Sequence, residues 1–348
     1  MTIKDLAEKT GYAVATVSRA LNNHPNVSEK ARAAILQAAE ESGFQLNTNA
    51  KQLKQQKPTS ILVVVKGTGN ELFSELVENI QNLIAQTSYP LLVDYLDEDD
   101  NEVLRAAQLC REKKPLGILF LGGNRQNFQE HFDMIQVPCV LVTNDAADFP
   151  YPNLSSVCVD DFQASRCAVD MLAAMGDRSI VLVGGWREVS DTSRLRYQGS
   201  LQAIRAHGMS FDPELDYQGG RFSYADGYNA AAKLLADGRQ FTALMAQSDV
   251  MAIGAIRALA DHGLRVPEDV SVVGFDGRAL GSYLVPQLST ICQPARQMAQ
   301  RSVEILTACI EDGASAVHER VPFTLASRES IRRIHSEEVA LRKEKAVF

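Results

Sequence analysis

From residue 61 onward, short apolar runs alternate with segments in which apolar residues recur at helical spacing. An alternation of strands and helices is typical of parallel sheets joined by right-handed crossovers. It continues through most of a chain of 348 residues, which is more than one such sheet needs, so we predict an α/β body with two sheets. The apolar runs are ILVVV, LLVDY, GILFL, CVLV, IVLVG, ALMA and VSVVGF, and the helical segments include 73–86, 102–113, 127–135 and 250–263.

Charge is divided unevenly along the chain. Residues 1–57 contain eight Lys or Arg and five Asp or Glu, a net charge of +3, whereas residues 58–348 have a net charge of −11. A basic head on an acidic body suits a module that binds a polyanion, attached to a part with another task.

The basic segment has the spacing of three short helices. Apolar residues predict a helix over 3–10, Gly11 ends it, and the apolar spacing resumes at Val14. Ser28 can cap a third helix, with a predicted buried stripe of Ala31, Ala34, Ile35 and Ala38. Such an arrangement fits a helix-turn-helix unit, and by spacing alone it fits a three-helix bundle without a ligand equally well.

The strings ATVSRALN and VSEKAR lie within this segment. Residues 2–44 as a whole resemble the DNA-binding head of the lactose-repressor and galactose-repressor family of bacterial transcription factors. The resemblance extends to about residue 334 and implies a core of the two-lobed periplasmic-binding-protein type. The implied domains are a helix-turn-helix head at 1–46, a hinge helix and linker at 47–60, an effector-binding and dimerisation core at 61–334, and a tail at 335–348.

The second helix would present its N-terminal end to the major groove of DNA. An apolar side chain there can pack on a thymine methyl without any hydrogen bond, and an arginine can bind O6 and N7 of guanine. Contacts to phosphates set the register but carry no sequence information. The resemblance implies base contacts for Val14, Ala15, Thr16 and Arg19, and phosphate contacts for Ser18 and Asn22.

The stretch QLNTNAKQLKQQKPTS stands where the family has its hinge helix. Asn47, Ala50 and Leu53 match the family pattern, whereas Leu46 replaces a proline and Lys51 an arginine. The resemblance implies DNA contacts for Lys51 and Leu53, with Leu53 entering the minor groove as a wedge that kinks the duplex. An ordinary solvated linker is the alternative.

Ligands of parallel α/β lobes bind at the carboxyl ends of the strands, here between the lobes. By resemblance, Arg196 would clamp paired sugar hydroxyls, Phe222 would cover the apolar face of a sugar, and Asp276 would accept from hydroxyls. The alternatives are that Arg196 pairs with a carboxylate, Phe222 is core, and Asp276 caps the following turn. The implied effector-binding residues are Asn70, Phe73, Thr143, Arg196, Phe222, Ser248 and Asp276.

Two of these positions depart from the family pattern. Thr143 stands where many relatives have Asp, and Ser248 stands where an Asn is usual. Asp249 is expected to cap the helix that follows it. These hydroxyl-reading groups and one aromatic ring suit a sugar or a sugar derivative as the effector.

The resemblance implies a repressor that acts as a homodimer on a pseudopalindromic operator of double-stranded DNA. The helix at 295–312 and the first body helix, near 73–86, are candidates for the dimer surface. We expect the chain to cross between lobes near 158–160, 287–291 and 322–325. A small molecule in the cleft would change the affinity for DNA through the arrangement of the lobes, and by family habit it would induce.

Other classes of protein lack support in the sequence. The six histidines show no HxxxH spacing and the six cysteines no CxxC pair, and GxSxG is absent, so we expect no enzyme, no metal and no cofactor. The N-terminus lacks a signal pattern and no apolar stretch approaches the roughly 20 residues of a membrane span, so we expect a cytoplasmic protein. The alternatives are a solute-binding protein, which would need a signal peptide, and a sugar kinase, which would need a phosphate loop.

Overall fold

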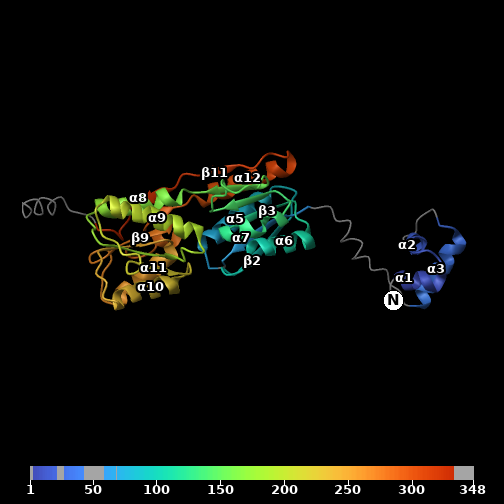
Figure 1. Cartoon of the computed structure of the whole chain (residues 1–348), viewed down its shortest axis with the longest axis horizontal. Helices are drawn as coiled ribbons and strands as arrows, with labels where there is room; N and C mark the ends of the chain where they lie inside the picture. The colour runs from blue at the N-terminus through green and yellow to red at the C-terminus, as the bar shows by residue number, and fades with distance from the viewer. Residues whose placement is uncertain (1–2, 22–26, 43–58, 68, 333–348) are drawn as a thin grey trace, which may run out of the picture. The chain divides into compact units, whose positions relative to one another are not determined.

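The computed structural model contains two compact units, Met1–Lys57 and Pro58–Phe348. Figure 1 shows the course of the chain in each unit. The predicted DNA contacts Asn22, Lys51 and Leu53, and the tail at 335–348, lie outside the described residues. The structure describes residues 3–21, 27–42, 59–67 and 69–332.

The first unit contains three helices, as predicted from the apolar spacing: α1 (Ile3–Thr10), α2 (Val14–Leu21) and α3 (Glu29–Glu41). Leu6, Val17 and Ile35 come from the three different helices and are fully buried in one small core. The predicted cap of the third helix is confirmed, since Ser28 Oγ accepts a hydrogen bond of 3.3 Å from the amide of Ala31.

The predicted buried stripe of α3 is wrong at Ala34 and only partly right at Ala38. Ala34 is exposed and Ala38 is half-buried, whereas Ala39 is buried together with Ala31 and Ile35. These three residues are four apart and therefore lie along one line of the helix, while Ala34 is turned about 100° from Ile35. The small core has room for a narrow stripe only.

The second unit confirms the prediction of two sheets with helices around them. The first sheet has the strand order β11-β5-β4-β3-β1-β2 and all its pairs are parallel. Its strands are β1 (Ile61–Lys66), β2 (Leu91–Leu96), β3 (Gly117–Leu121), β4 (Cys139–Val142), β5 (Leu154–Cys158) and β11 (His318–Arg320). The helices of this lobe are α5 (Glu71–Ile84), α6 (Glu102–Lys113), α7 (Arg125–His131), the short η1 (Phe132–Met134) and α12 (Ala295–Glu311).

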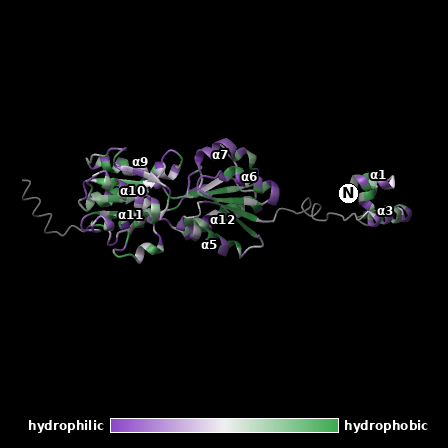
Figure 2. Ribbon diagram, turned by 90° about the horizontal axis from the view of Figure 1, so that it is seen from below, coloured by the Kyte–Doolittle hydropathy of each residue, from purple (hydrophilic) through white to green (hydrophobic). Residues whose placement is uncertain are grey.

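The second sheet has the order β12-β10-β9-β8-β6-β7, and only β12 runs antiparallel to its neighbour. Its strands are β6 (Ile180–Gly185), β7 (Tyr217–Gly220), β8 (Ala243–Ala246), β9 (Ser271–Asp276), β10 (Ser289–Cys292) and β12 (Thr324–Ala326). Its helices are α8 (Asp161–Ala174), α9 (Asp191–Ala206), α10 (Tyr224–Ala236), α11 (Asp249–Asp261) and the short η2 (Ala279–Ser282). In Figure 2 the strands of this unit carry mostly hydrophobic residues, whereas the helices around them carry both hydrophobic and hydrophilic ones.

The chain passes between the lobes three times in the described residues. The first passage, at residues 159–160 between β5 and α8, agrees with the prediction. The second lies at 293–294 rather than 287–291, because β10 still pairs with β9 in the second lobe before α12 returns to the first. The third lies at 321–323, between β11 and β12, and overlaps the predicted range.

The two helices expected at a dimer surface pack against each other within the first lobe. Leu76 and Ile80 of α5, and Met298 and Leu306 of α12, are fully buried in the shared core. Their apolar faces are therefore occupied inside the body. None of the described helices is long and apolar enough to cross a membrane.

We predict that Ile35→Ala destabilises the head by about 2–5 kcal/mol, because it leaves a cavity where three helices meet. Leu36→Ala is the matched control, since Leu36 is exposed on the same helix and its loss should change stability by less than about 0.5 kcal/mol. Hydrogen exchange of the α3 amides measures the stability of the head within the whole chain. Equal effects of the two substitutions would contradict this description of the core.

Candidate functional site

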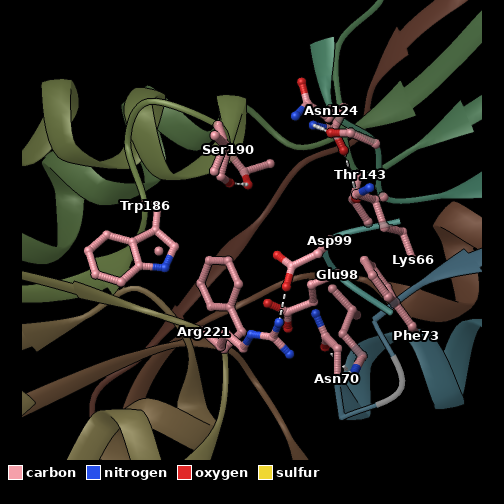
Figure 3. A pocket seen from close by; sticks show the side chains of 18 of the residues that line it. Lys66, Asn70, Phe73, Glu98, Asp99, Asn124, Thr143, Trp186, Ser190 and Arg221 are labelled. Atoms are coloured by element: carbon pink, nitrogen blue, oxygen red, sulfur yellow. Dashed lines mark hydrogen bonds and ion pairs between the residues drawn. The ribbon is translucent and has the colours of Figure 1, made fainter. Parts of the chain in front are cut away.

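A cavity of about 290 Å³ lies between the lobes of the second unit. Its walls come from the carboxyl ends of strands in both sheets, where ligands of parallel α/β folds bind. In Figure 3, Trp186, Ser190 and Arg221 of the second lobe lie across from Lys66, Phe73, Asn124 and Thr143 of the first.

The structure brings together six of the seven residues predicted to bind an effector. The six that line the cavity are Asn70, Phe73, Thr143, Arg196, Phe222 and Asp276. Ser248 does not line the cavity. It is buried at the start of α11, where its Oγ accepts a hydrogen bond of 3.3 Å from the amide of Met251. Ser248 is therefore a helix cap, and its side chain is engaged in the fold.

Two of these residues have a backbone conformation that L-amino acids rarely adopt. Thr143 follows β4 in the first lobe with φ of 80°, and Asp276 ends β9 in the second lobe with φ of 115°. For a β-branched residue such as threonine this is a true outlier, and strain of this kind tends to cluster at ligand sites. Each lobe therefore contributes one residue with a strained backbone to the lining of the same cavity.

Arg196 is almost completely buried, and the structure is compatible with both interpretations of it, as a residue of the cavity and as the partner of a carboxylate. Its Nε donates to Oδ1 of Asp161 at 2.7 Å and its Nη1 donates to the carbonyl oxygen of Gln247 at 2.6 Å. The guanidinium also lies over the ring of Phe275, 3.6 Å from the centroid. It pairs with a carboxylate and lines the cavity at the same time. Burial raises the pKa of Asp161 to about 6, while the attraction of Arg196 opposes that rise.

Asp276 faces a second group of the cavity wall, Gln293. Its Oδ1 accepts a hydrogen bond of 2.8 Å from Gln293 Nε2. The amides of Gly277 and Arg278 in the following turn donate to Thr290 and Asp249 instead, so the carboxylate does not cap that turn. Burial raises the pKa of Asp276, and Arg196 and Arg278 act against that rise. Within the described part of the chain, Gln293 Oε1 is buried without a hydrogen-bond partner. An acceptor of this kind can take a hydrogen bond from a ligand hydroxyl.

The buried carboxylate of Glu102 organises the first lobe's side of the cavity. One oxygen accepts from the backbone amide of Asn124 at 2.6 Å, and the other lies 2.7 Å from Lys66 Nζ and 2.8 Å from Asn127 Nδ2. Lys66, Asn124 and Asn127 all line the cavity. The sequence analysis did not identify this group, because its members come from separate parts of the chain. The signal in the sequence is that Lys66 directly follows the apolar run ILVVV and Asn124 comes soon after the run GILFL.

Trp186 and Arg221 also line the cavity and were not predicted. Trp186 directly follows the glycines that end β6, and its side chain is 55% exposed. A single tryptophan at the end of an apolar run in a chain with few aromatic residues is the signal that could have found it.

Polar contacts join the two lobes around the cavity. Arg221 pairs with Asp97 at 3.3 Å and also with Asp99, whose contact is drawn in Figure 3. Further cross-lobe contacts run from the Tyr224 hydroxyl to Glu71 and from Arg278 Nη1 to Glu75. Because the two partners of each contact come from different lobes, a change in the separation of the lobes must break or re-form these contacts.

In the head, α2 leaves a continuous face uncovered. Val17 and Ala20 point into the core, whereas Ala15 and Arg19 are exposed and Val14 is 42% exposed. Thr16 is half-buried on the same helix, and the side chain of Ser18 lies outside the described residues. An exposed apolar residue beside an exposed arginine is the composition expected of a helix that reads base edges.

Asp249 ties three elements of the second lobe together. It is the first residue of α11, after the Ser248 cap, so the prediction that it caps the helix is wrong. Its Oδ1 accepts from Thr290 Oγ1 at 2.6 Å and its Oδ2 accepts from the amide of Arg278 at 2.6 Å. Burial, followed by the nearby charge of Asp276, raises the pKa of Asp249 to about 7.

Comparison with known proteins shows which families and which relatives the chain resembles. Residues 2–47 match the bacterial regulatory proteins of the lacI family, and residues 169–331 match a periplasmic binding protein-like domain. The HTH-type transcriptional regulator MalR of Clostridium butyricum is 36% identical over 335 residues, which are 95% of this chain and 99% of MalR. The HTH-type transcriptional repressor CytR of Escherichia coli strain K12 is 31% identical over 88% of each chain.

Solved structures agree over nearly the whole chain. The lac repressor dimer bound to operator and the anti-inducer ONPF has a TM-score of 0.71 and 26% identity, over 95% of this chain and 99% of that one. The complex of the transcriptional regulator CelR with cellobiose has a TM-score of 0.68 and 25% identity over the same shares.

Fold and site together define a two-lobed ligand-binding body of the periplasmic-binding-protein type, in one chain with a helix-turn-helix head. The chain belongs to the lacI family of bacterial regulatory proteins, and it is a ligand-responsive transcriptional regulator.

We predict that Asp249 makes the body less stable as pH rises. A carboxyl whose folded pKa is raised binds more protons folded than unfolded, so its stabilising contribution is complete below pH 3.8 and is lost as pH rises through about 7. The slope from one such group is at most about 1.4 kcal/mol per pH unit. Asp249→Asn should flatten this part of the profile in urea unfolding from acid to neutral pH. Parallel profiles for the variant and the parent protein would show that Asp249 does not titrate in this range.

Proposed function

We propose that the protein is a repressor that binds a pseudopalindromic operator as a homodimer, and that a small neutral sugar in the cavity between its lobes changes its affinity for DNA. The observation that carries the proposal is the pairing, in one chain, of an exposed recognition face on α2 with a polar cavity whose walls hold Thr143 and Asp276 in strained conformations. The relatives support it, since CytR is named a repressor and CelR was solved with cellobiose.

The charges of the cavity favour a neutral effector over an anionic one. Each positive side chain in the lining has an acidic partner: Lys66 has Glu102, Arg196 has Asp161, and Arg221 has Asp97 and Asp99. Two more carboxyl groups, those of Glu98 and Asp276, also line the cavity. Burial raises the pKa of Glu98, which reflects the cost of placing its charge there. A phosphate or a sugar acid would meet these carboxylates without a free cation to offset them.

The cavity offers the mixture of groups that recognises a sugar. Asp276 and Gln293 provide acceptors for hydroxyl hydrogens, Asn124 and Asn127 provide amides, and Phe222 provides an aromatic face. A few convergent polar groups beside aromatic surface are typical of small-molecule sites. We propose that these groups bind the effector and carry out no reaction on it. Among the described residues there is no cluster of His, Cys, Asp and Glu able to hold a metal ion.

Control of DNA binding would follow from the position of the cavity between two lobes. A ligand that touches both lobes favours one separation of the lobes over others, and the cross-lobe pairs of Arg221, Tyr224 and Arg278 must adjust to it. If the favoured separation suits DNA less well, the ligand is an inducer. We propose induction, with Lys51 and Leu53 of the hinge contacting the operator. Because a bacterial operator lies in the cytoplasm, we propose that the protein is cytoplasmic.

A second copy of the chain is part of the proposal, because one head covers only a few base pairs. Tyr283 and Val285, after η2, are 82% and 97% exposed, which is unusual for large apolar side chains. We propose that this loop contributes to the contact between the two bodies, since the apolar faces of α5 and α12 are already buried within their own lobe.

We predict that Arg19→Ala lowers the affinity for a selected operator by about 1–3 kcal/mol, because a bidentate contact to guanine is lost. The duplex is selected from a random pool with the purified protein, and binding is measured by fluorescence anisotropy at fixed salt. Arg19→Lys is the matched control that keeps the charge but not the paired donors, so it should lose most of the same specificity. An equal loss on operator and on competitor DNA would make Arg19 a phosphate contact.

We predict that neutral sugars raise the melting temperature of the body and that their anionic counterparts do not, because a ligand that binds only the folded state stabilises it. The comparison pairs glucose with glucose 6-phosphate and with glucuronate, and adds maltose, cellobiose and ribose. Glu98→Gln should narrow the difference within each pair by removing one carboxylate. A phosphorylated sugar that stabilises the parent protein more than its neutral form does would contradict the proposed class. Operator binding measured with each stabilising sugar then tests induction.

A further inference from the structure

A second hollow lies on the second lobe beside the cavity, with a volume of about 680 Å³. We call it the outer groove. It shares Trp186, Gly220 and Arg221 with the lining of the cavity, so the two hollows adjoin at these three residues. The rest of its lining is mostly polar or charged and includes Arg187, Glu214, Gln218, Asp226, Asn229 and Lys233.

Trp186 stands between the two hollows with its indole against the strand β7. A Cβ placed on Gly219 would lie 2.8 Å from Cε3 of Trp186, so the ring fits only because this position has no side chain. The ring is nevertheless 55% exposed, although a side chain of this size is costly to leave in water. In Figure 3 the indole lies at the edge of the cavity, beside Ser190 and Arg221.

The walls of the outer groove are held in place by contacts within the protein. The guanidinium of Arg187 lies over the rings of Tyr197 and Tyr217, 4.5 Å and 4.6 Å from their centroids. On the other side, Lys233 Nζ donates to Gln218 Oε1 at 3.0 Å. Asp226 accepts from the amide of Arg221 at 2.7 Å. A groove whose walls are already held in place loses little conformational entropy when it binds a ligand.

We propose that the outer groove is a second sugar subsite, and that the effector is an oligosaccharide that extends from the cavity past Trp186 into the groove. This inference rests on the proposed sugar effector and specifies its length. The indole covers the apolar face of the ring that leaves the cavity. Asn229, exposed on α10, and the Gln218–Lys233 pair bind the hydroxyls of the next ring. A monosaccharide fills the cavity alone and leaves Trp186 exposed.

The test is a chain-length series measured by calorimetry on the full-length protein. The probes are glucose, maltose, maltotriose and maltotetraose, and in parallel cellobiose and cellotriose. In one of the two series we expect affinity to rise about tenfold when a ring is added that reaches the groove. Trp186 is the only tryptophan, so the fluorescence of the parent protein should change with the longer sugars more than with glucose.

Two variants separate the groove from the cavity. Trp186→Ala should remove the gain in affinity on chain extension, and Asn229→Ala should reduce it. Asn82→Ala is the matched control, because Asn82 is exposed on α5 in the other lobe, and it should keep the full gain. If sugars bind with the same affinity at every length, the outer groove is not a subsite, while the proposed sugar-binding cavity stands. If no sugar of either series binds, the proposed effector class fails as well.

Discussion

The buried pair of Arg196 and Asp161 is the interaction on which the ligand-binding body depends. Asp161 begins α8, just after the chain has passed from the first lobe to the second, and Arg196 comes from α9. The same guanidinium donates to the carbonyl of Gln247, after β8, and lies over Phe275 of β9. Removing either charge would leave the other buried and uncompensated, which typically costs about 3–5 kcal/mol. The pair therefore holds helices and strands of the second lobe in register at the wall of the cavity.

Ion pairs also engage the other positively charged side chains around the cavity. Glu102 holds Lys66 in the first lobe, and Asp97 and Asp99 hold Arg221 of the second. Because the cations are already paired, the lining presents mainly neutral donors and acceptors together with the carboxyls of Glu98 and Asp276. Some of these pairs lie within one lobe and others join the two. The first kind fixes the shape of each wall, and the second kind makes the separation of the walls sensitive to what lies between them.

Much of this arrangement could be predicted from local patterns in the chain. The apolar runs correspond to strands, which are buried except for the edge strand β2, and the three head helices begin near the predicted residues. Both follow from local periodicity of apolar residues. Arg196, Phe222 and Asp276 could be named because they lie in short motifs that resemble those of the family, although Arg196 lies within α9 and not at the end of a strand. Ser248 could not be judged in this way. A serine after a strand can face a ligand or cap the next helix, and only the path of the backbone at α11 makes it a cap.

The sequence by itself determined the class of fold, the division into a basic head and an acidic body, and the family, because these depend on periodicity, composition and contiguous motifs. Only the tertiary structure decided which side chains share the cavity. Lys66, Trp186 and Gln293 are far apart in the chain and meet because parallel strands bring their carboxyl ends to one edge of each sheet. The tertiary structure also decided how these side chains are paired and buried. A polar or charged group finds its partner only when distant segments come together and exclude water, and only then does losing the partner become costly.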